Sequence, residues 1–478
     1  MPDSEYAEPV LEVPVAPSGP DAVVVRHPFL VMLVASCGFV IVLDSFAAAV
    51  AFPRIVQAFP DTPRTTLAWL STGYAIALSA LLLVAGKLAD RYGMRRVFLI
   101  GMGGFMVGAI ASALAPNVGL LIAARVAQGS AGALMVSTSI ALALLGYPAE
   151  RRGTAMGAIG ILGSVASLAG PVLAGSIIDI GGSWRWVFLV SVPIGAVVLA
   201  VGPRVLPVGT PTTSGERVVI DLIGVVQVVL ASGLLTLGML QSGAWGWGDW
   251  RTATALVVAV VTGTAFVRRC RRVSAPLLSF DLFRRPTFLV ATVSQNFSQM
   301  AVYGFFFWAP LFLTNVWGWS ASRVGWVTAI PLLLACSSLP FGRFADRHGY
   351  RGLLVLGGIV CSSSLLCNIL VLGESPSFWR LLPGLVLFGV GIGMIGITTH
   401  SGALAGVDRA DLAEANSVFQ TCRRQVQTLG IAVVLGLLGA RSADSLDRFR
   451  LVWIVAGVLC ALSSVIAAWY PRPVSRST

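Results

Sequence analysis

The chain has 478 residues, of which 56% are hydrophobic and only 11% are charged, and its formal net charge is +12 at pH 7. A soluble domain carries about 25% charged residues, because polar side chains must cover its apolar core. The composition therefore argues against a soluble enzyme and against a nucleic-acid-binding protein. It predicts an all-α polytopic membrane protein, and the short clusters of basic residues between long apolar runs are typical of loops between membrane spans.

Apolar runs long enough to cross a bilayer begin at Phe29. The preceding segment, 1–26, has no basic stretch ahead of an apolar one, so we expect a disordered cytoplasmic tail without a cleaved signal peptide. A helix needs about 20 apolar residues to cross roughly 30 Å of hydrocarbon. Fourteen runs come near this length, the eighth being the shortest, and are predicted to span the membrane: 29–52, 67–86, 97–115, 118–145, 153–178, 186–203, 219–240, 252–267, 287–314, 323–342, 352–372, 380–404, 413–438 and 451–470.

The distribution of basic residues predicts the orientation of these spans. Arg and Lys are concentrated in alternate loops, at 87–96, 151–152, 204–217, 268–285 and 343–351. Positively charged loops remain in the cytoplasm, so both termini are expected there, in a cytoplasmic (inner) membrane. Tryptophans gather on the opposite side and predict an interfacial belt, formed by Trp69, Trp184, Trp186, Trp245, Trp247, Trp250, Trp317, Trp319 and Trp379.

Two of the basic loops carry nearly the same decapeptide, Gly86–Arg95 and Gly342–Arg351. Six of the ten positions are identical, and in the first copy they are Gly86, Ala89, Asp90, Arg91, Gly93 and Arg95. The first glycine is expected to let two helices approach, and the second to permit a tight turn. The arginines are expected to anchor the loop at anionic lipid headgroups.

This repeat predicts a chain made of two related halves, as in many transporters. The two copies are further apart than six spans require at about 30 residues per span and loop, so two extra helices are expected between the halves. The predicted organisation is a tail (1–26), a six-helix bundle (27–204), two inserted helices with a linker (205–275), a second six-helix bundle (276–470) and a C-terminal tail (471–478).

No motif predicts a cofactor, a metal ion or an enzymatic reaction. The seven cysteines form no CxxC or CxxH pair, so neither a metal site nor a disulfide framework is indicated. The Gly86-Lys87 pair is not followed by Ser or Thr and lacks the leading glycine of a P-loop. Energy is therefore expected from an ion gradient rather than from a nucleotide.

Several ordered motifs resemble the Major Facilitator Superfamily, and specifically its fourteen-helix drug:proton antiporter branch. The decapeptide is similar to the superfamily's loop signature, and Leu43-Asp44 followed by Ala51-Phe52-Pro53 is similar to the first-helix pattern of that branch. Further matching residues are Arg125, Gln128, Gly129, Gly170, Pro171, Gly175, Trp184, Arg185, Trp186, Pro193, Thr421, Arg423 and Gly430. The chain departs from the branch pattern at Phe46, Ala49, Ala174, Arg424, Val426 and Gln427.

The resemblance implies that two bundles rock around a central cavity and that Asp44 carries the proton. Asp44 is the only carboxylate predicted deep inside a span, where an ionised Asp costs about 2.5 to 3.5 kcal/mol on insertion scales. The alternative is a structural hydrogen bond between helices, and a permanent ion pair in a dry seam would argue against the carrier role. Arg125 is expected either to modulate this carboxylate or to satisfy carbonyls at a helix end.

The remaining motif residues are expected to serve conformational change. Small residues let the span that contains Gly170 and Gly175 lie close to a neighbour, and Pro171 is expected to bend it. Gln128 and Gly129 belong to the same conformational set. The Asp-Arg pairs of the two decapeptides, Asp90-Arg91 and Asp346-Arg347, are expected to latch one state, or else to form simple turns.

Polar residues within later spans are candidates for the substrate cavity. Gln295, Gln299 and Tyr303 recur at four-residue spacing and share one helix face, with Asn296 beside them and Trp308 following. Such a stripe suits an amphipathic drug-like ligand, or it holds helices together. Arg423 and Arg424 either face the cavity or pair with acidic residues at the start of their span.

The predicted function is proton-coupled export of small hydrophobic or cationic drugs by alternating access. The expected partners are a small amphipathic drug-like substrate and the lipid bilayer, with no nucleic acid, and the sequence does not reveal any protein partner. Two alternatives remain open: an importer of a small metabolite on the same fold, and a non-transporting sensor or assembly protein. Drug accumulation in cells with and without the protein distinguishes an exporter, which lowers it, from an importer, which raises it. A sensor would need an extramembrane domain, and no loop exceeds about twenty residues.

Overall fold

The computed structural model describes residues 28–145, 152–206, 221–273, 281–335, 341, 344–345, 348–405, 407, 412–439 and 445–471. The predicted tail 1–26, nearly all of the tail 471–478 and the pair Asp346-Arg347 lie outside the described residues. Within those ranges the chain forms helices and turns and no β-strand.

The helices fall into a first half, an inserted pair and a second half. The first half consists of α1 (Pro28–Ala58), α2 (Arg64–Leu67), α3 (Trp69–Tyr92), α4 (Met94–Leu114), α5 (Val118–Leu145), α6 (Arg152–Gly181), α7 (Arg185–Leu189) and α8 (Ser191–Val205). The inserted pair is α9 (Leu222–Trp245) and α10 (Trp250–Cys270). The second half consists of the 3₁₀ helix η2 (Asp281–Arg284), α11 (Pro286–Asn315), α12 (Ala321–Ala335), α14 (Tyr350–Val371), α15 (Phe378–Leu404), α16 (Leu412–Leu438) and α17 (Leu446–Ala467).

Every predicted span overlaps one of these helices. In the described residues, eleven helices are long and apolar enough to cross a membrane, and the shorter apolar segments Val165–Gly181 and Ala321–Ala335 belong to α6 and α12. The number of fourteen crossings therefore stays a prediction. On α4, Ile100, Val107 and Leu114 are 66%, 67% and 74% exposed and lie seven residues apart on one helix face. An apolar surface stripe of this kind is stable against lipid, not water.

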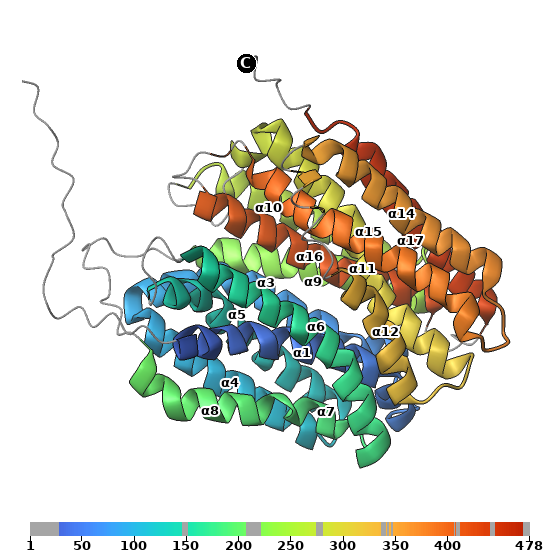
Figure 1. Cartoon of the computed structure of the whole chain (residues 1–478), viewed down its shortest axis with the longest axis horizontal. Helices are drawn as coiled ribbons and strands as arrows, with labels where there is room; N and C mark the ends of the chain where they lie inside the picture. The colour runs from blue at the N-terminus through green and yellow to red at the C-terminus, as the bar shows by residue number, and fades with distance from the viewer. Residues whose placement is uncertain are drawn as a thin grey trace, which may run out of the picture.

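The two halves lie side by side, with the first half (blue to green) below the second (yellow to red) in Figure 1. The halves meet where α1 contacts α11, where α3 contacts α16 and where α6 contacts α12. Of the inserted pair, α9 packs against both α3 and α16, whereas α10 packs mainly on α9 and exposes Val257, Val260 and Val261. The inserted helices are thus peripheral, and α9 is the one that touches both halves.

The closest contact between the halves is the crossing of α6 and α12. A Cβ atom built on Gly175 would overlap the carbonyl oxygen of Ala321, and one built on Gly325 would overlap the carbonyl oxygen of Pro171. Only glycine allows two helix backbones to approach this closely. The crossing lies at the end of the molecule that carries Trp184, Trp317 and Trp319, which we call the tryptophan-rich end.

The structure corrects two expectations about the loops. The decapeptide that begins at Gly86 is mostly helical, because α3 continues to Tyr92 and α4 starts at Met94. The turn is therefore made by Gly93 alone, with φ of 90°, and Gly349 in the second copy has φ of 87°. The predicted tryptophan belt is also only partly exposed.

The predicted belt contains both exposed and buried tryptophans. Trp247, Trp250 and Trp379 are 60%, 70% and 77% exposed, as expected at a membrane interface. The three that define the tryptophan-rich end are instead buried in the largest hydrophobic core. Trp184 packs on Phe59 and Phe188 of the first half, and Trp317 packs on Phe312 and Trp319 of the second half.

Candidate functional site

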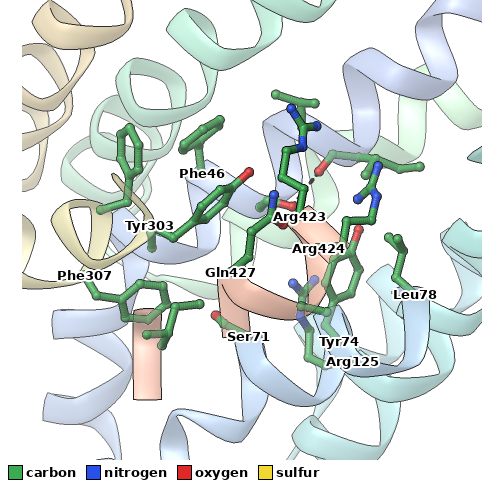
Figure 2. A pocket seen from close by; sticks show the side chains of 17 residues that line it. Phe46, Ser71, Tyr74, Leu78, Arg125, Tyr303, Phe307, Arg423, Arg424 and Gln427 are labelled. Atoms are coloured by element: carbon green, nitrogen blue, oxygen red, sulfur yellow. Dashed lines mark hydrogen bonds between the residues drawn. The ribbon is translucent and has the colours of Figure 1, made fainter. Parts of the chain in front are cut away.

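A cavity lies between the two halves. It is bordered by Arg125, one of the two proton-coupling candidates, and by Arg423 and Arg424 of α16. Its empty space, counted together with the open side, is about 850 Å³. Side chains from α1, α3, α5, α11 and α16 line it (Figure 2). These are Ile41, Val42, Ser45, Phe46, Ala49, Ser71, Tyr74, Ala75, Leu78, Arg125, Tyr303, Phe306, Phe307, Arg423, Arg424, Gln427 and Ile431.

Asp44 and Arg125 form an ion pair at one side of this cavity. The Nη1 atom of Arg125 donates to both carboxylate oxygens of Asp44, at 2.8 and 3.0 Å, and the two side chains are only 1% and 2% exposed. Gln128 completes the cluster, because its Nε2 donates to Asp44 at 3.2 Å and its Oε1 accepts from Arg125 at 2.7 Å. Three helices, α1, α3 and α5, are joined here, since Arg125 Nε also donates to the Leu70 carbonyl at 3.3 Å.

Aromatic rings cover the guanidinium of Arg125. Its Cζ lies 4.4 Å from the centroid of Tyr74 and 5.3 Å from that of Phe188. Such contacts with a desolvated cation are worth about 2 kcal/mol. Tyr74 and Arg125 themselves border the cavity, whereas Asp44 lies behind Arg125. Asp44 is therefore a neutralised carboxylate beside the cavity, not a free one within it.

The charge of the cavity wall is positive. Arg423 and Arg424 line it, and no carboxylate occurs among its described lining residues. In the described part of the chain, neither arginine forms an ion pair or a hydrogen bond, and the Nε atom of Arg423 is buried without a partner. Both arginines therefore face the cavity. The expectation of cationic substrates depended on a free cavity carboxylate, which the described residues do not contain.

Most of the other predicted cavity residues lie elsewhere on α11. Tyr303 lines the cavity as expected, but Gln295, Asn296, Gln299 and Trp308 do not. Gln295 is 1% exposed and accepts a hydrogen bond from Thr399 of α15, so it connects two helices of the second half. Trp308 packs among Phe305 and Trp453 at ring distances of 5.2 and 5.4 Å.

Among the glycines of the conformational set, Gly129, Gly170 and Gly175 lie at close helix contacts. A Cβ on Gly129 would overlap the carbonyl oxygen of Tyr74, and one on Gly170 would lie 3.1 Å from the Leu43 carbonyl oxygen. Gly175 contacts α12 as described above. A Cβ on Gly86 meets no described atom within 4 Å, so no close helix approach is observed there.

Two arginines of the first decapeptide, Arg91 and Arg95, lie beside the turn between α3 and α4, whereas the side chain of Asp90 lies outside the described part of the structure. Arg91 is exposed and stands over the ring of Tyr92 at 5.4 Å, and Arg95 donates to the Pro203 carbonyl at the end of α8. The guanidinium of Arg95 thus ties the α3–α4 turn to α8. The latching role of Asp90 and Arg91 stays a prediction.

Of the aromatic wall of the cavity, sequence reasoning noted Phe306 beside the polar stripe of its span but did not assign Phe46 or Phe307 to the cavity. Phe46, Phe306 and Phe307 line it, and the Phe46 and Phe306 rings meet at 4.4 Å across the two halves. Tyr74 was also missed, although its spacing of four residues to Leu78 places both on one face of α3. Gln427 was noted only as a departure from the family pattern, yet it lies one turn after Arg423 and Arg424 on the cavity face of α16.

Comparison with known proteins identifies the family. The model of the Major Facilitator Superfamily matches residues 34–430 and 291–478. The chain is 31% identical to the tetracenomycin C resistance and export protein of Streptomyces glaucescens, over 87% of this chain and 77% of that protein. It is 30% identical to the multidrug resistance protein Stp of Mycobacterium tuberculosis, over 88% and 78% of the two chains.

The chain belongs to the Major Facilitator Superfamily. This member is also 29% identical to the probable actinorhodin transporter of Streptomyces coelicolor, over 93% of this chain and 80% of that protein. Its fold is similar to that of a solved POT family transporter, with a TM-score of 0.63 at 15% identity over 92% of this chain and 95% of the other. As a member of the superfamily it is a multi-pass membrane transporter.

Proposed function

We propose that this transporter exports small drug-like molecules from the cytoplasm in exchange for protons. The observation that carries the proposal is the cavity between the two halves, with Arg125 in its wall and Asp44 bound to that arginine. Because Arg125 borders the cavity, the ion pair can open toward it and is not enclosed in a dry seam between helices. Export is favoured by the relative named as a tetracenomycin C resistance and export protein, at 31% identity, and by the multidrug resistance protein Stp, at 30%. Both termini are proposed to lie in the cytoplasm, as the charge distribution predicts.

Proton coupling follows from competition for the carboxylate of Asp44. Arg125 is permanently charged, so Asp44 accepts a proton only when the ion pair opens. Protonation removes the negative charge and weakens the charge-assisted hydrogen bonds from Arg125 and Gln128. Arg125 then becomes free to move into the cavity that it already borders, and the contact between α1 and α5 is loosened.

The proposed cycle starts with the cavity open to the cytoplasm and Asp44 ionised, so that substrate binds. After the halves switch, Asp44 is protonated from outside and the substrate leaves. Each proton supplies about 2.3 kcal/mol per 100 mV of membrane potential, and about 1.4 kcal/mol per pH unit. One proton therefore sustains roughly a tenfold to several-hundredfold gradient of a neutral substrate.

The direct test is Asp44→Asn in everted membrane vesicles. Asparagine keeps the size of the side chain and a hydrogen-bond acceptor for Arg125, but it cannot release or bind a proton at neutral pH. We expect proton-driven substrate uptake into the vesicles to be lost, while substrate-induced quenching of intrinsic tryptophan fluorescence remains. Undiminished proton-driven uptake by the variant would remove Asp44 from the coupling role.

Import of a metabolite is the second candidate. The riboflavin transporter RibZ of Clostridioides difficile is 24% identical to this chain, over 95% of this chain and 99% of that protein. Cells that carry or lack the transporter separate the two functions by sign. Export lowers the accumulation of an added drug, whereas import raises the accumulation of its substrate.

A further inference from the structure

Two neighbouring arginines on α16 enter the cavity without anionic partners. Arg423 and Arg424 both line it, and in the described residues no carboxylate contacts either side chain. The only described acidic group near the cavity, Asp44, is fully engaged by Arg125 and Gln128. The cavity therefore carries an excess of two positive charges over its described lining.

Such an arrangement is unfavourable unless an anion enters. Adjacent like charges repel each other, and a charge in a partly buried site costs several kcal/mol when it lacks a partner. The buried and unpartnered Nε atom of Arg423 is a hydrogen-bond donor that is left unsatisfied. A carboxylate or phenolate placed against the guanidinium groups would relieve both costs, because arginine binds such groups through paired N–H donors.

The opposite wall of the cavity is aromatic. Phe46 from the first half and Phe306 and Phe307 from the second half line it, together with the ring of Tyr303. In Figure 2 the guanidinium groups of Arg423 and Arg424 lie at the top of the view, Arg125 lies at the bottom, and Phe46, Tyr303 and Phe307 lie to the left. A flat ring system that carries one acidic group would thus meet aromatic faces along its body and cations at one edge.

We propose that the substrates are aromatic anions, meaning fused-ring carboxylates or acidic phenols, whose charged group is bound by Arg423 and Arg424 and whose rings pack against Phe46, Phe306 and Phe307. This inference rests on the proposed export function and narrows its substrate class. It also changes the energetics, because outward movement of a monovalent anion is itself driven by an inside-negative potential, at about 2.3 kcal/mol per 100 mV.

The binding test uses three fluorescent probes that share one ring system and differ in charge. They are anthracene-2-carboxylate, its methyl ester and 2-(aminomethyl)anthracene, titrated against the full-length protein in neutral phosphatidylcholine nanodiscs. Neutral lipid removes anionic headgroups as rival occupants. We expect the carboxylate to bind at least tenfold more tightly than the ester, and the cation to bind most weakly.

Variants assign the selectivity to the two arginines. Arg423→Gln and Arg424→Gln should each weaken carboxylate binding about tenfold or more, while ester affinity stays within about twofold. Unchanged ester binding also reports that the variant cavity is folded. Arg268→Gln is the matched control, because it removes the same charge from an exposed position on α10 outside the cavity. Adding phosphatidylglycerol tests whether a lipid headgroup occupies the same site, in which case it would compete with the carboxylate only in wild type.

Two results would overturn the inference: equal affinity for carboxylate and ester, or loss of all three probes to the same extent in the arginine variants. Competition by phosphatidylglycerol for a site that does not prefer the carboxylate over the ester would also count against it, because it would assign the arginines to lipid.

Transport in proteoliposomes separates this inference from the proposed function. Arginine-dependent carboxylate binding without any effect of a pH gradient on transport would remove proton coupling alone, whereas proton-driven export of the ester that ignores both arginines would remove the anion site alone.

Discussion

The carboxylate of Asp179, at the end of α6, accepts a hydrogen bond of 2.8 Å from the backbone N–H of Ser322 in the first turn of α12. Its second oxygen accepts from the N–H of Ala321 at 3.3 Å. The first N–H groups of a helix have no partner within that helix, so a carboxylate at this place acts as a cap. Here the cap comes from the other half of the molecule, and it therefore stabilises closure of the tryptophan-rich end.

Removing this cap should favour opening of that end. We expect Asp179→Ala to destabilise the closed state by about 0.5 to 1 kcal/mol, at the lower end of the range for helix caps because the side chain is exposed. This corresponds to about a two- to fivefold rise in the open population. The measurement is the labelling rate of Ala49→Cys, a cavity position, by an impermeant maleimide added outside cells that carry an otherwise cysteine-free protein.

The matched control is Asp249→Ala. Asp249 also caps a helix, with its side chain accepting from the Arg251 N–H at 2.7 Å, but α10 does not take part in the contact between α6 and α12. Labelling at position 49 should not change in this variant. Equal acceleration by both substitutions would mean that the Asp179 effect is general loosening of the fold.

The pH dependence of this contact follows from the hydrogen bonds on Asp179, which lies one residue beyond the predicted span 153–178. Partial burial acts to raise the pKa of Asp179, but hydrogen bonds from Ser322, Ser320 and Ala321 outweigh it and hold the pKa below its usual value. A carboxylate with a lowered pKa contributes its stability above the ordinary value of about 3.9, and loses it as the pH falls through the lower closed-state pKa.

The labelling rate at position 49 is divided by the rate in Asp179→Asn at the same pH, because only the thiolate reacts and its fraction changes with pH. This ratio should be constant between about pH 8 and pH 5, and should rise only below about pH 4. Asp179 is thus not expected to sense protons in the physiological range, which leaves that role to the Asp44–Arg125 pair. A change in labelling between pH 5 and pH 8 that disappears in Asp179→Asn would reverse this assignment.

The Asp44–Arg125 pair should be costly to break from one side only. Arg125→Gln leaves the Asp44 carboxylate buried without its cation, and we expect the free energy of unfolding to fall by about 3 to 5 kcal/mol. The double variant Asp44→Asn/Arg125→Gln removes both charges and should recover most of that loss. Thermal unfolding in detergent measures both, with Arg450→Gln as the control, since the Arg450–Asp447 pair is exposed and should contribute at most about 1 kcal/mol.

Two glycines of α6 make a matched pair for the crossing with α12. Gly175→Ala would force a methyl group onto the Ala321 carbonyl, and we expect a cost of about 1 to 3 kcal/mol and faster labelling at Ala49→Cys. Gly163→Ala meets no described atom within 4 Å, and should stabilise the helix by about 0.5 to 1 kcal/mol without any change in labelling. Equal effects at the two positions would contradict a specific contact at Gly175.

The fold could be predicted from sequence because the bilayer imposes length and composition on each helix. The repeat at Gly86 and Gly342 also revealed the two halves, since glycine and charge in register carry a local signal. What could not be predicted was which face of each helix points inward. Hydrophobicity does not separate lipid-facing from core-facing residues in a membrane protein, as exposed Leu114 and buried Phe306 illustrate.

Only part of the candidate site could be predicted from the sequence. Asp44 and Arg125 were found because ionisable residues within spans are rare. Their direct contact could not be read from the sequence, because they lie 81 residues apart and meet only through the packing of α1 on α5. The absence of described carboxylates around Arg423 and Arg424 is likewise a property of the folded chain.

Two aromatic residues on α11 test the placement of the cavity against that of the core. Trp308 packs on Phe305 and Trp453, away from the cavity, so Trp308→Leu should lower the free energy of unfolding by about 1 to 3 kcal/mol. Its affinity for substrate should stay within about twofold of wild type once the amount of folded protein is matched. Tyr303→Leu should behave in the opposite way, with weaker substrate binding and little change in unfolding, because Tyr303 is half-buried and borders the cavity. Thermal unfolding and equilibrium binding on the same purified samples separate the two. A loss of affinity in Trp308→Leu that matches the loss in Tyr303→Leu would place the substrate deeper in the second half, between α11 and α17.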